Sequence, residues 1–172
     1  WLLAQTFIQD RLLNNSGQPL QDARIHAMTL YRTPQSFKSK FNRSLHNDKG
    51  IYNIHSWLLH HGEKLKNRFT VSAYKTLNHL LGSVDICRDQ TLFEAVVLPI
   101  DAEIHLVAVD SDLFFIPDEN RRTHTRLLKL GKKVHYYQID SPHGHDAFLI
   151  EFNQLRSILS EIFIPQPSLI SE

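Results

Sequence analysis

The sequence predicts an α/β protein in which a helical region precedes a short parallel sheet. Two observations support this prediction. Residues 1 to about 88 carry their apolar side chains at helical spacing, whereas from about residue 96 strand-like and helix-like segments alternate. The order strand, helix, strand, helix is typical of a parallel sheet with helices on both faces. We therefore expect a helical region over residues 1–90 and an α/β region over residues 91–172.

The helical region is expected to contain helices with one apolar stripe each. The first candidate spans residues 19–32. A polar, turn-like stretch over residues 42–50 separates it from two further candidates, the second of which should stop at Gly82. The three stripes are Leu20, Ala23, Ala27 and Leu30; Ile54, Trp57, Leu58, His61 and Leu65; and Val71, Tyr74, Leu77, Leu80 and Leu81.

The α/β region is expected to begin with a short buried strand. Residues 104–109 read Ile-His-Leu-Val-Ala-Val, whose length and β-branched content suit such a strand. A helix should start at Pro117, with acidic residues in its favourable first turn, and stop at Gly131. Residues 133–139 form the second strand candidate. The last helix should carry the apolar stripe Phe148, Phe152, Leu155, Leu159 and Ile162, and end before Pro165 and Pro167.

The composition excludes several classes of protein. Hydrophobic residues make up 42% of the 172 residues and charged residues 22%, which are globular values. A net charge of +1 leaves no strong basic surface for nucleic acid, and no run of about 18 apolar residues predicts a membrane span. The single cysteine, Cys87, cannot form an internal disulfide and fits a reducing compartment. We expect a cytoplasmic protein with no nucleic-acid or membrane partner.

Two polar clusters follow the two predicted strands. Asp110-Ser111-Asp112 comes after the first, and His143-Gly144-His145-Asp146 comes after the second. Ligands and catalytic groups collect beyond the carboxyl ends of parallel strands. An acid followed by a histidine is also the order of the last two members of a catalytic triad. The pattern leaves alternatives open: Asp112 can be a turn former, Asp110 competes with it as the acid, and His145 can be a solvated loop residue.

The residues around these clusters resemble a known family. The segment from Val109 to Pro117 is similar to the aspartate motif of homoserine O-acetyltransferases, and Asp140 to Leu149 is similar to their histidine motif. Residues 23–32, with Phe37 and residues 41–43, resemble the first helices of the family's lid. The resemblance covers nearly the whole chain in the right order. It implies the C-terminal portion of an α/β-hydrolase fold with an inserted helical lid.

The resemblance also implies roles for five residues. Asp112 matches the triad acid and His145 the triad base, while Asp146 is expected to contact the amino group of homoserine. Arg24 is expected to bind the substrate carboxylate, with Tyr31 beside it. An arginine fork suits a carboxylate, and a spacing of seven residues puts Arg24 and Tyr31 on one helix face, about 10 Å apart. The alternatives are an ordinary surface pair for Arg24 and Tyr31, and a helix cap for Asp146.

The activity that the resemblance implies is transfer of an acetyl group from acetyl-CoA to L-homoserine through an acyl-serine intermediate, in methionine biosynthesis. No Gly-x-Ser-x-Gly motif for a nucleophile occurs, and the chain opens at Trp1 without an initiator methionine. We expect the serine and the oxyanion hole to precede Trp1, and the isolated chain to be inactive. The resemblance further implies a homodimer through the lid, acetyl-CoA as co-substrate and no bound cofactor.

Two other functions remain open from the sequence. One is a related α/β-hydrolase, or an acyltransferase for serine or another amino alcohol. The other is a non-catalytic dimerising module, in which exposed apolar side chains such as Phe37, Phe41 and Trp57 pack on a second copy.

The 11 histidines raise the question of a metal site. The tempting groups are His60-His61, His124 and His143-x-His145, and none forms a helix-borne HExxH pattern. We expect no metal. The chain also departs from the family's usual motifs, with one more residue between Asp112 and Pro117, and with His143 in place of a tyrosine.

Overall fold

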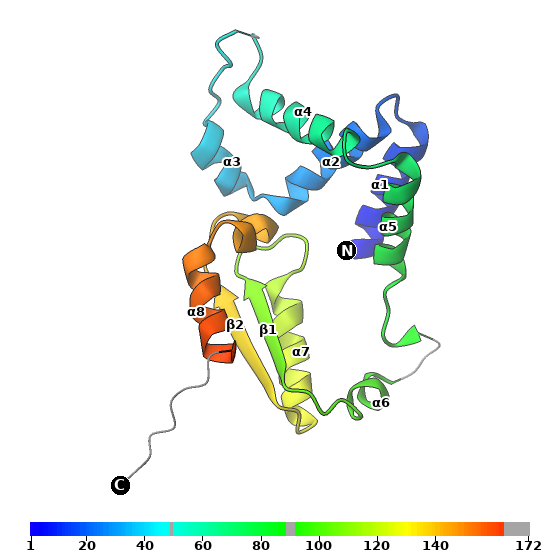
Figure 1. Ribbon diagram of the computed structural model, residues 1–172, viewed down its shortest axis with the longest axis vertical. Coiled ribbons are helices and arrows are strands. Elements are labelled where there is room, and N and C mark those ends of the chain that lie inside the picture. The colour runs from blue at the N-terminus through cyan, green and yellow to red at the C-terminus, as the bar shows by residue number, and fades with distance from the viewer. Residues whose placement is uncertain (49, 89–91, 164–172) are drawn as a thin grey trace.

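The computed structural model describes residues 1–48, 50–88 and 92–163 (Figure 1). Helices fill the first half of the chain, and a two-stranded sheet between two helices fills the second. The elements are α1 (Leu2–Asn15), α2 (Pro19–Tyr31), α3 (Pro34–Phe41), α4 (Asn53–Lys66), α5 (Val71–Ser83), α6 (Phe93–Val97), β1 (Ile104–Val109), α7 (Pro117–Lys129), β2 (Val134–Ile139), the 3-10 helix η2 (Gly144–Leu149) and α8 (Phe152–Phe163).

Helix α2 lies at the centre of the helical region and packs against both α1 and α4. Its proline at the first turn suits a helix start, because the missing N–H would have no partner there. The core between these helices is small and consists of Leu13, Leu20, Ala23 and Leu65, with Phe69, Val71 and Tyr74 packed against it. Helix α5 lies beside α1 (Figure 1). The core therefore uses part of each predicted stripe, and the third contributes Val71 and Tyr74 while Leu77 and Leu80 are exposed.

One apolar group predicted to be exposed packs internally instead. The rings of Phe37 and Phe41 on α3 both lie against Trp57 on α4, with centroids 5.9 and 5.7 Å apart. Phe41 is buried. The prediction of exposure is therefore wrong for Phe41, because α3 folds back onto α4, while Phe37 and Trp57 remain partly exposed beside it.

The two strands pair in parallel, with Ile104 opposite Val134 and Val109 opposite Ile139. Helix α7 covers one face of the pair and α8 the other, as Figure 1 shows. Side chains alternate between the faces, so Leu127 and Val134 form one core with Val97, while Val109, Ile139 and Ile158 form another with Ala147. The predicted order of strand, helix, strand and helix, and the parallel sheet, are confirmed.

Two predicted helix ends are wrong. Gly82 does not stop its helix, because α5 continues to Ser83. Its lack of a side chain instead allows α1 to approach, since a Cβ there would lie 3.1 Å from the Thr6 hydroxyl. Phe148 precedes α8 and belongs to η2. Pro165, Pro167 and the predicted region boundary at residues 90 and 91 lie outside the described residues. Among the described residues, no helix is both long and apolar enough to cross a membrane.

Replacing Ile139 with alanine should destabilise the α/β region strongly. The side chain is fully buried, at 0% exposure, where β2 meets Val109, Ala147 and Ile158. Removing it leaves a cavity, which costs about 2–5 kcal/mol of unfolding free energy. Urea unfolding measures the loss. Val107→Ala is the control, because Val107 is 38% exposed. Equal losses in the two variants would contradict the core described here.

The stability of the helical region should fall as the pH drops below 6.5. Burial, followed by the positive charges of Arg24, His60, Lys64 and Lys40, lowers the pKa of His61 to about 4. The folded state therefore disfavours the charged ring, so stability is complete above pH 6.5 and declines between pH 6.5 and 4. A His61→Gln variant should lose less stability than the parent between pH 7 and pH 5 in urea unfolding. The same loss in both would contradict this assignment.

Candidate active site

The two polar clusters leave the sheet at the same edge. Val109 and Ile139 are paired partners at the ends of the parallel strands, so the loops that follow them emerge side by side. A turn after β1, with the Asp112 amide on the Val109 carbonyl, brings the Asp112 side chain back over the strand end. His145 lies in η2, the next element after β2. Asp112 Oδ2 and His145 Nδ1 are 2.9 Å apart.

Each oxygen of the buried Asp112 carboxylate has its own partner. Oδ1 accepts hydrogen bonds from the backbone amides of Phe114 (2.7 Å) and Phe115 (2.9 Å), and Oδ2 faces the imidazole. The residue is therefore a turn former and a histidine partner at once. A carboxylate on Nδ1 assigns the proton to that nitrogen and leaves the Nε2 lone pair of a neutral ring free. Among the described residues, His145 Nε2 has no hydrogen-bond partner.

Asp110 braces the two loops and does not contact His145. Its Oδ1 accepts from the Ser141 amide at 2.9 Å. Ser111 adds two more links, since its hydroxyl donates to the Ser141 carbonyl and accepts from the Gly144 amide. Of the two aspartates that competed for the acid position, Asp112 is the one beside the histidine. These hydrogen bonds between the two loops keep Asp112 close to His145.

Aromatic rings surround His145, which sequence reasoning did not anticipate. The centroids of Tyr31, Phe114, Phe115 and Phe148 lie between 5.2 and 5.8 Å from that of the imidazole. Phe114 and Phe115 come from the loop after β1, Phe148 comes from η2, and Tyr31 comes from α2. Such a shell limits the access of water to the histidine and fixes its ring plane.

Gly144 fits where α2 meets the histidine loop. Its φ is +69°, and a Cβ would lie 3.1 Å from the Tyr31 carbonyl oxygen. Gly144→Ala therefore adds backbone strain and pushes α2 away from η2, which should cost about 1–3 kcal/mol and disturb the aromatic shell. Thermal unfolding measures the loss. Gly17→Ala, which has open space and no positive φ, is the control. A fully stable Gly144→Ala variant would contradict this packing.

Asp146, expected to face a substrate amine, forms an ion pair with Arg32. The Arg32 Nε and Asp146 Oδ2 atoms are 3.2 Å apart, which is close enough for charge attraction, although the N–H is not aligned as a hydrogen bond. Burial raises the pKa of Asp146, and the charges of Arg32, Arg24 and His145 act in the opposite direction. The sequence alone does not reveal Arg32 as the partner of Asp146. A pairing across 114 positions of sequence leaves no local signal there.

Arg24 and Tyr31 lie on one face of α2, as the helical spacing predicted, but their side chains are closer together than the predicted distance of about 10 Å. The guanidinium carbon of Arg24 is 5.3 Å from the centre of the Tyr31 ring. Within the described part of the chain, the Arg24 guanidinium makes neither an ion pair nor a hydrogen bond. Burial raises the pKa of Tyr31, with an opposing effect from Arg24. The tyrosine therefore keeps its proton, and Arg24 is a half-buried cation without a carboxylate of its own.

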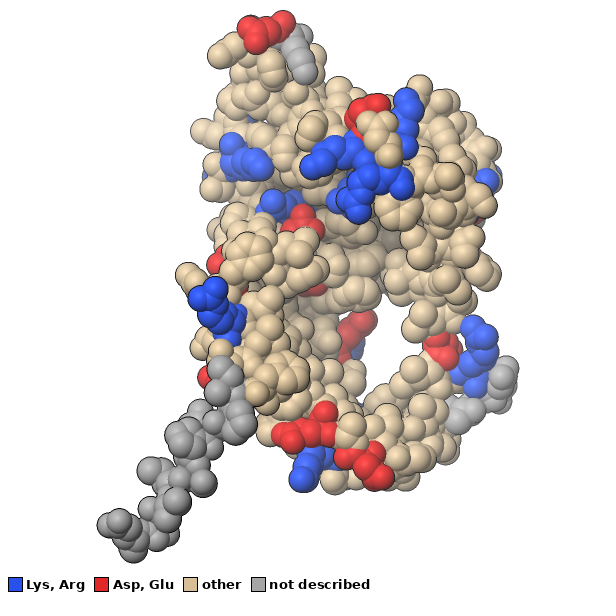
Figure 2. All heavy atoms as spheres, viewed as in Figure 1, with Lys and Arg blue, Asp and Glu red and all other residues tan. Residues whose placement is uncertain are grey.

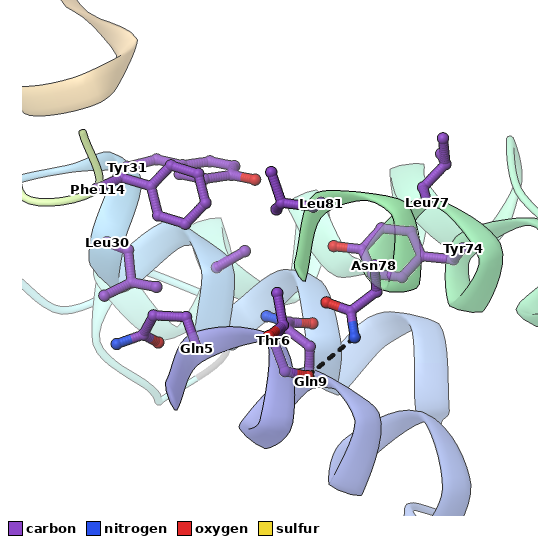
Figure 3. A pocket seen from close by; sticks show the side chains of 11 residues that line it. Gln5, Thr6, Gln9, Leu30, Tyr31, Tyr74, Leu77, Asn78, Leu81 and Phe114 are labelled. Atoms are coloured by element: carbon purple, nitrogen blue, oxygen red, sulfur yellow. Dashed lines mark hydrogen bonds between the residues drawn. The ribbon is translucent and has the colours of Figure 1, made fainter. Parts of the chain in front are cut away.

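Two hollows border the site. One, of about 340 Å³, is lined by Asp112, His145, Phe115 and Phe148 among others, and therefore reaches the reactive ring itself. The other, of about 200 Å³, lies between α1, α2 and α5, behind Tyr31 and Phe114 (Figure 3). Within the part of the chain that the structure describes, the buried side-chain oxygens of Gln5 and Gln9 have no hydrogen-bond partner. The first hollow is the one that opens onto His145, since the rings of Tyr31 and Phe114 separate the second from it.

None of the histidine groups considered from the sequence gathers metal ligands. Among the residues that the structure describes, the one group of three that could hold an ion is Glu103, His105 and His135, at the other end of the sheet.

Comparison with known proteins identifies relatives. No family model matches the chain. A homoserine O-acetyltransferase of Chloroherpeton thalassium is 35% identical over 140 residues, which are 81% of this chain and 36% of that protein. Another, of Nostoc punctiforme, is 35% identical over 150 residues, covering 84% and 41%. The chain is homologous to the C-terminal part of homoserine O-acetyltransferases. It spans less than half the length of these two relatives.

Solved structures agree on the fold. A homoserine O-acetyltransferase from Bacillus anthracis superposes with a TM-score of 0.75 at 13% identity, and one from Staphylococcus aureus with 0.72 at 23%; each covers 97% of this chain and 48% of its own. A mutant of esterase E22 also gives 0.75, at 12% identity. These neighbours are α/β-hydrolase-fold proteins. The fold class predicted from the sequence, part of an α/β-hydrolase, is confirmed.

Proposed function

We propose that this chain supplies the acid and the base of an O-acyltransferase, with Asp112 orienting His145. The observation that supports this proposal best is the 2.9 Å contact between Asp112 Oδ2 and His145 Nδ1. It leaves Nε2 free to take a proton in a place screened by aromatic rings. Curated relatives that share this part of the chain are named homoserine O-acetyltransferase, which favours acyl transfer over other uses of the same pair.

The nucleophile in this proposal is a serine outside the chain, in the part of the relatives that precedes the matched region. Its hydroxyl attacks the thioester carbonyl of acetyl-CoA while His145 Nε2 takes its proton. The C–S bond then breaks, and the CoA sulfur leaves with the proton from His145. Asp112 stabilises the imidazolium form between these steps. The result is an acyl-serine and a neutral histidine.

The second half of the reaction reverses these roles for the acceptor. His145 takes the proton of the L-homoserine hydroxyl, and the hydroxyl oxygen attacks the acyl carbonyl. The serine oxygen leaves and regains the proton, so the product is O-acetylhomoserine. The proposed chemistry needs side chains and the acyl donor, with no bound cofactor, and would serve methionine biosynthesis.

The acceptor would be held by its two charges. Arg24, which has no carboxylate partner within the described residues, would bind the homoserine carboxylate. Tyr31 stacks beside that guanidinium and would offer its hydroxyl. Asp146 would face the ammonium, while its ion pair with Arg32 keeps the buried carboxylate oriented. Arg24 is near enough to oppose the rise that burial causes in the pKa of Asp146, and two opposite charges this close together favour an amino acid over a simple alcohol.

The helical region would act as a lid that excludes water and attracts the donor. An acyl-serine hydrolyses if water reaches it, and Tyr31 on α2 contributes to the shell around His145. Figure 2 shows several lysine and arginine side chains on the helical half of the molecule, with a few acidic ones among them. Helices α3 and α4 both carry lysines in their last turns, at positions 38, 40, 64 and 66. Such a surface would attract the phosphates of CoA.

The proposed partner of the lid is a second copy of the protein. Helices α1 and α5 lie side by side and expose several large apolar side chains: Leu3, Phe7, Leu77 and Leu80. This face takes the place of the aromatic group on α3 and α4, which is used internally. A Phe7→Glu change should convert the dimer to a monomer in light scattering. A parent protein that is already monomeric would refute this partner.

The test of the proposed function begins with the coding sequence upstream of Trp1. A strand followed by Gly-x-Ser-x-Gly there would supply the nucleophile, and an unrelated domain would refute the proposal. The full-length protein is then assayed with acetyl-CoA and either L-homoserine or L-serine. Faster acetylation of homoserine supports the proposal. Release of free acetate at the same rate with and without an amino acid would identify a hydrolase.

A further inference from the structure

The amino-terminal end of the sheet carries a second cluster of ionisable side chains, far from the site above. His105 and His135 are direct partners in the parallel register, one on each strand. Since paired residues project from the same face of a sheet, both rings lie on the same side, with centroids 4.8 Å apart and planes within 12°. The two imidazoles are therefore neighbours without any bend in the backbone.

A carboxylate completes the group. Glu103 lies two residues before His105, and its Oε1 is 2.7 Å from His135 Nε2 and 3.7 Å from His105 Nε2. One ligand atom from each of the three residues lies within 4.8 Å of the others. In a tetrahedral zinc site the ligand atoms are about 3.3 Å apart, since zinc lies about 2.0–2.1 Å from nitrogen and from oxygen. Two of the three separations already bracket that value.

Only small movements are needed to bring the three ligand atoms together, and they involve side chains that are partly exposed. The side chains of Glu103 and His135 are about half exposed, at 50% and 47%, while that of His105 is 22% exposed. Small rotations of the two rings and the carboxylate would bring the three atoms to ligand distance without moving the strands. The same exposure lets an ion enter from solvent and leaves one position for water.

A neighbouring tyrosine offers His105 the hydrogen-bond acceptor that metal-binding histidines usually have. The Tyr137 hydroxyl lies 3.3 Å from His105 Nδ1. When Nε2 binds a metal, Nδ1 carries the proton, and histidine ligands usually donate that proton to an oxygen nearby. Tyr137 is itself packed against the core under α8, so this oxygen is held in place. The cluster thus has ligands, an outer partner and an entry route.

We propose that Glu103, His105 and His135 bind a divalent transition-metal ion such as Zn²⁺. Imidazole and carboxylate ligands suit zinc better than magnesium or calcium, which prefer all-oxygen sites. The ion links the segment before β1 to both strands, at the end of the sheet opposite Asp112. Its role is structural, because four strand residues, about 13 Å, separate His105 from the end of β1. The proposal is independent of the acyltransferase function.

Zinc titration of the chelator-treated chain by calorimetry tests the site. We expect one equivalent to bind in the micromolar range and to raise the unfolding temperature by about 5–10 °C at saturation. The variant His105→Gln/His135→Gln should lose that equivalent and the shift. The matched control is His60→Gln/His79→Gln, which removes two exposed histidines from α4 and α5 and should bind as the parent does. Equal zinc binding in all three proteins would overturn the proposal.

Two further measurements keep the test decisive if the double variant folds poorly. Tyr137→Phe leaves all three ligands in place and should weaken zinc binding about tenfold, because it removes the partner of Nδ1. Co²⁺ should give the intense visible absorption of a four-coordinate site in the parent and lose it in Glu103→Gln. Unchanged zinc affinity in Tyr137→Phe together with unchanged cobalt absorption in Glu103→Gln would overturn the proposal.

Discussion

Replacing His145 with glutamine in the full-length protein should lower kcat for acyl transfer by at least about 10³-fold. Glutamine is close to histidine in size and can still donate an N–H to Asp112, so the loop and the aromatic shell should survive. What disappears is the free Nε2 that takes and returns the proton in both half-reactions. Steady-state kinetics with saturating acetyl-CoA and homoserine measure the loss.

Variants of Asp112, the partner of His145, and of a control histidine make this prediction more specific. Asp112→Asn should also lower kcat, by about 10³–10⁴-fold, because an amide cannot stabilise the imidazolium form and can reverse the ring's proton assignment. The two losses should not add in the double variant, since both residues serve one step. His124→Gln, on α7 beside Tyr136, should keep parental kinetics. Near-normal turnover of His145→Gln would remove the residue from the mechanism.

Replacing Arg24 with alanine should raise the KM for homoserine by about 30-fold or more, while the KM for acetyl-CoA changes little. The reason is that a guanidinium without a carboxylate of its own lies beside Tyr31, and truncating one partner of a buried charge pair costs about 2–5 kcal/mol. Initial rates at varied homoserine concentration measure the change. The KM of Arg24→Lys for homoserine should lie between those of the parent and Arg24→Ala, because lysine keeps the charge and lacks the forked guanidinium.

An acceptor without a carboxylate isolates the interaction. For an amino alcohol that lacks this group, the parent and Arg24→Ala should have similar KM values, since there is nothing for Arg24 to bind. Arg122→Ala is the control, because its side chain is exposed on α7 and 77% accessible. A uniform rise in KM for both acceptors would show that Arg24 supports the fold of α2 and does not bind the carboxylate.

Much of this architecture could be predicted because its signals are local. The run 104–109 is apolar and short, and Pro117 and Gly131 mark the two ends of a helix and its turn, so the strands and α7 fall close to where the sequence places them. The strand ends pointed to the two polar clusters, because parallel strands end at one edge, and the resemblance to the family's motifs then singled out Asp112 and His145. Patterns of this kind depend on chain direction and spacing alone.

The contacts that could not be predicted join distant parts of the chain. Arg32 reaches Asp146, and Phe37 packs on Trp57, only because α2 and α4 fold against other elements. Gly82 resembled a helix stop, but the approach of α1 explains it better. The cluster at His105 and His135 could not be predicted for a similar reason. A cross-strand pair has no fixed spacing in the sequence, and its register is visible only in the sheet.

The most direct test of the central claim is to look for the acyl-enzyme. Full-length protein is mixed with acetyl-CoA without an acceptor, quenched in acid, and analysed intact and after digestion by mass spectrometry. We predict one added acetyl group on a serine, removed by homoserine, and far slower labelling in the His145→Gln variant. An unmodified protein that still acetylates homoserine, or equal labelling in the parent and in His145→Gln, would contradict the role of Asp112 and His145 proposed here.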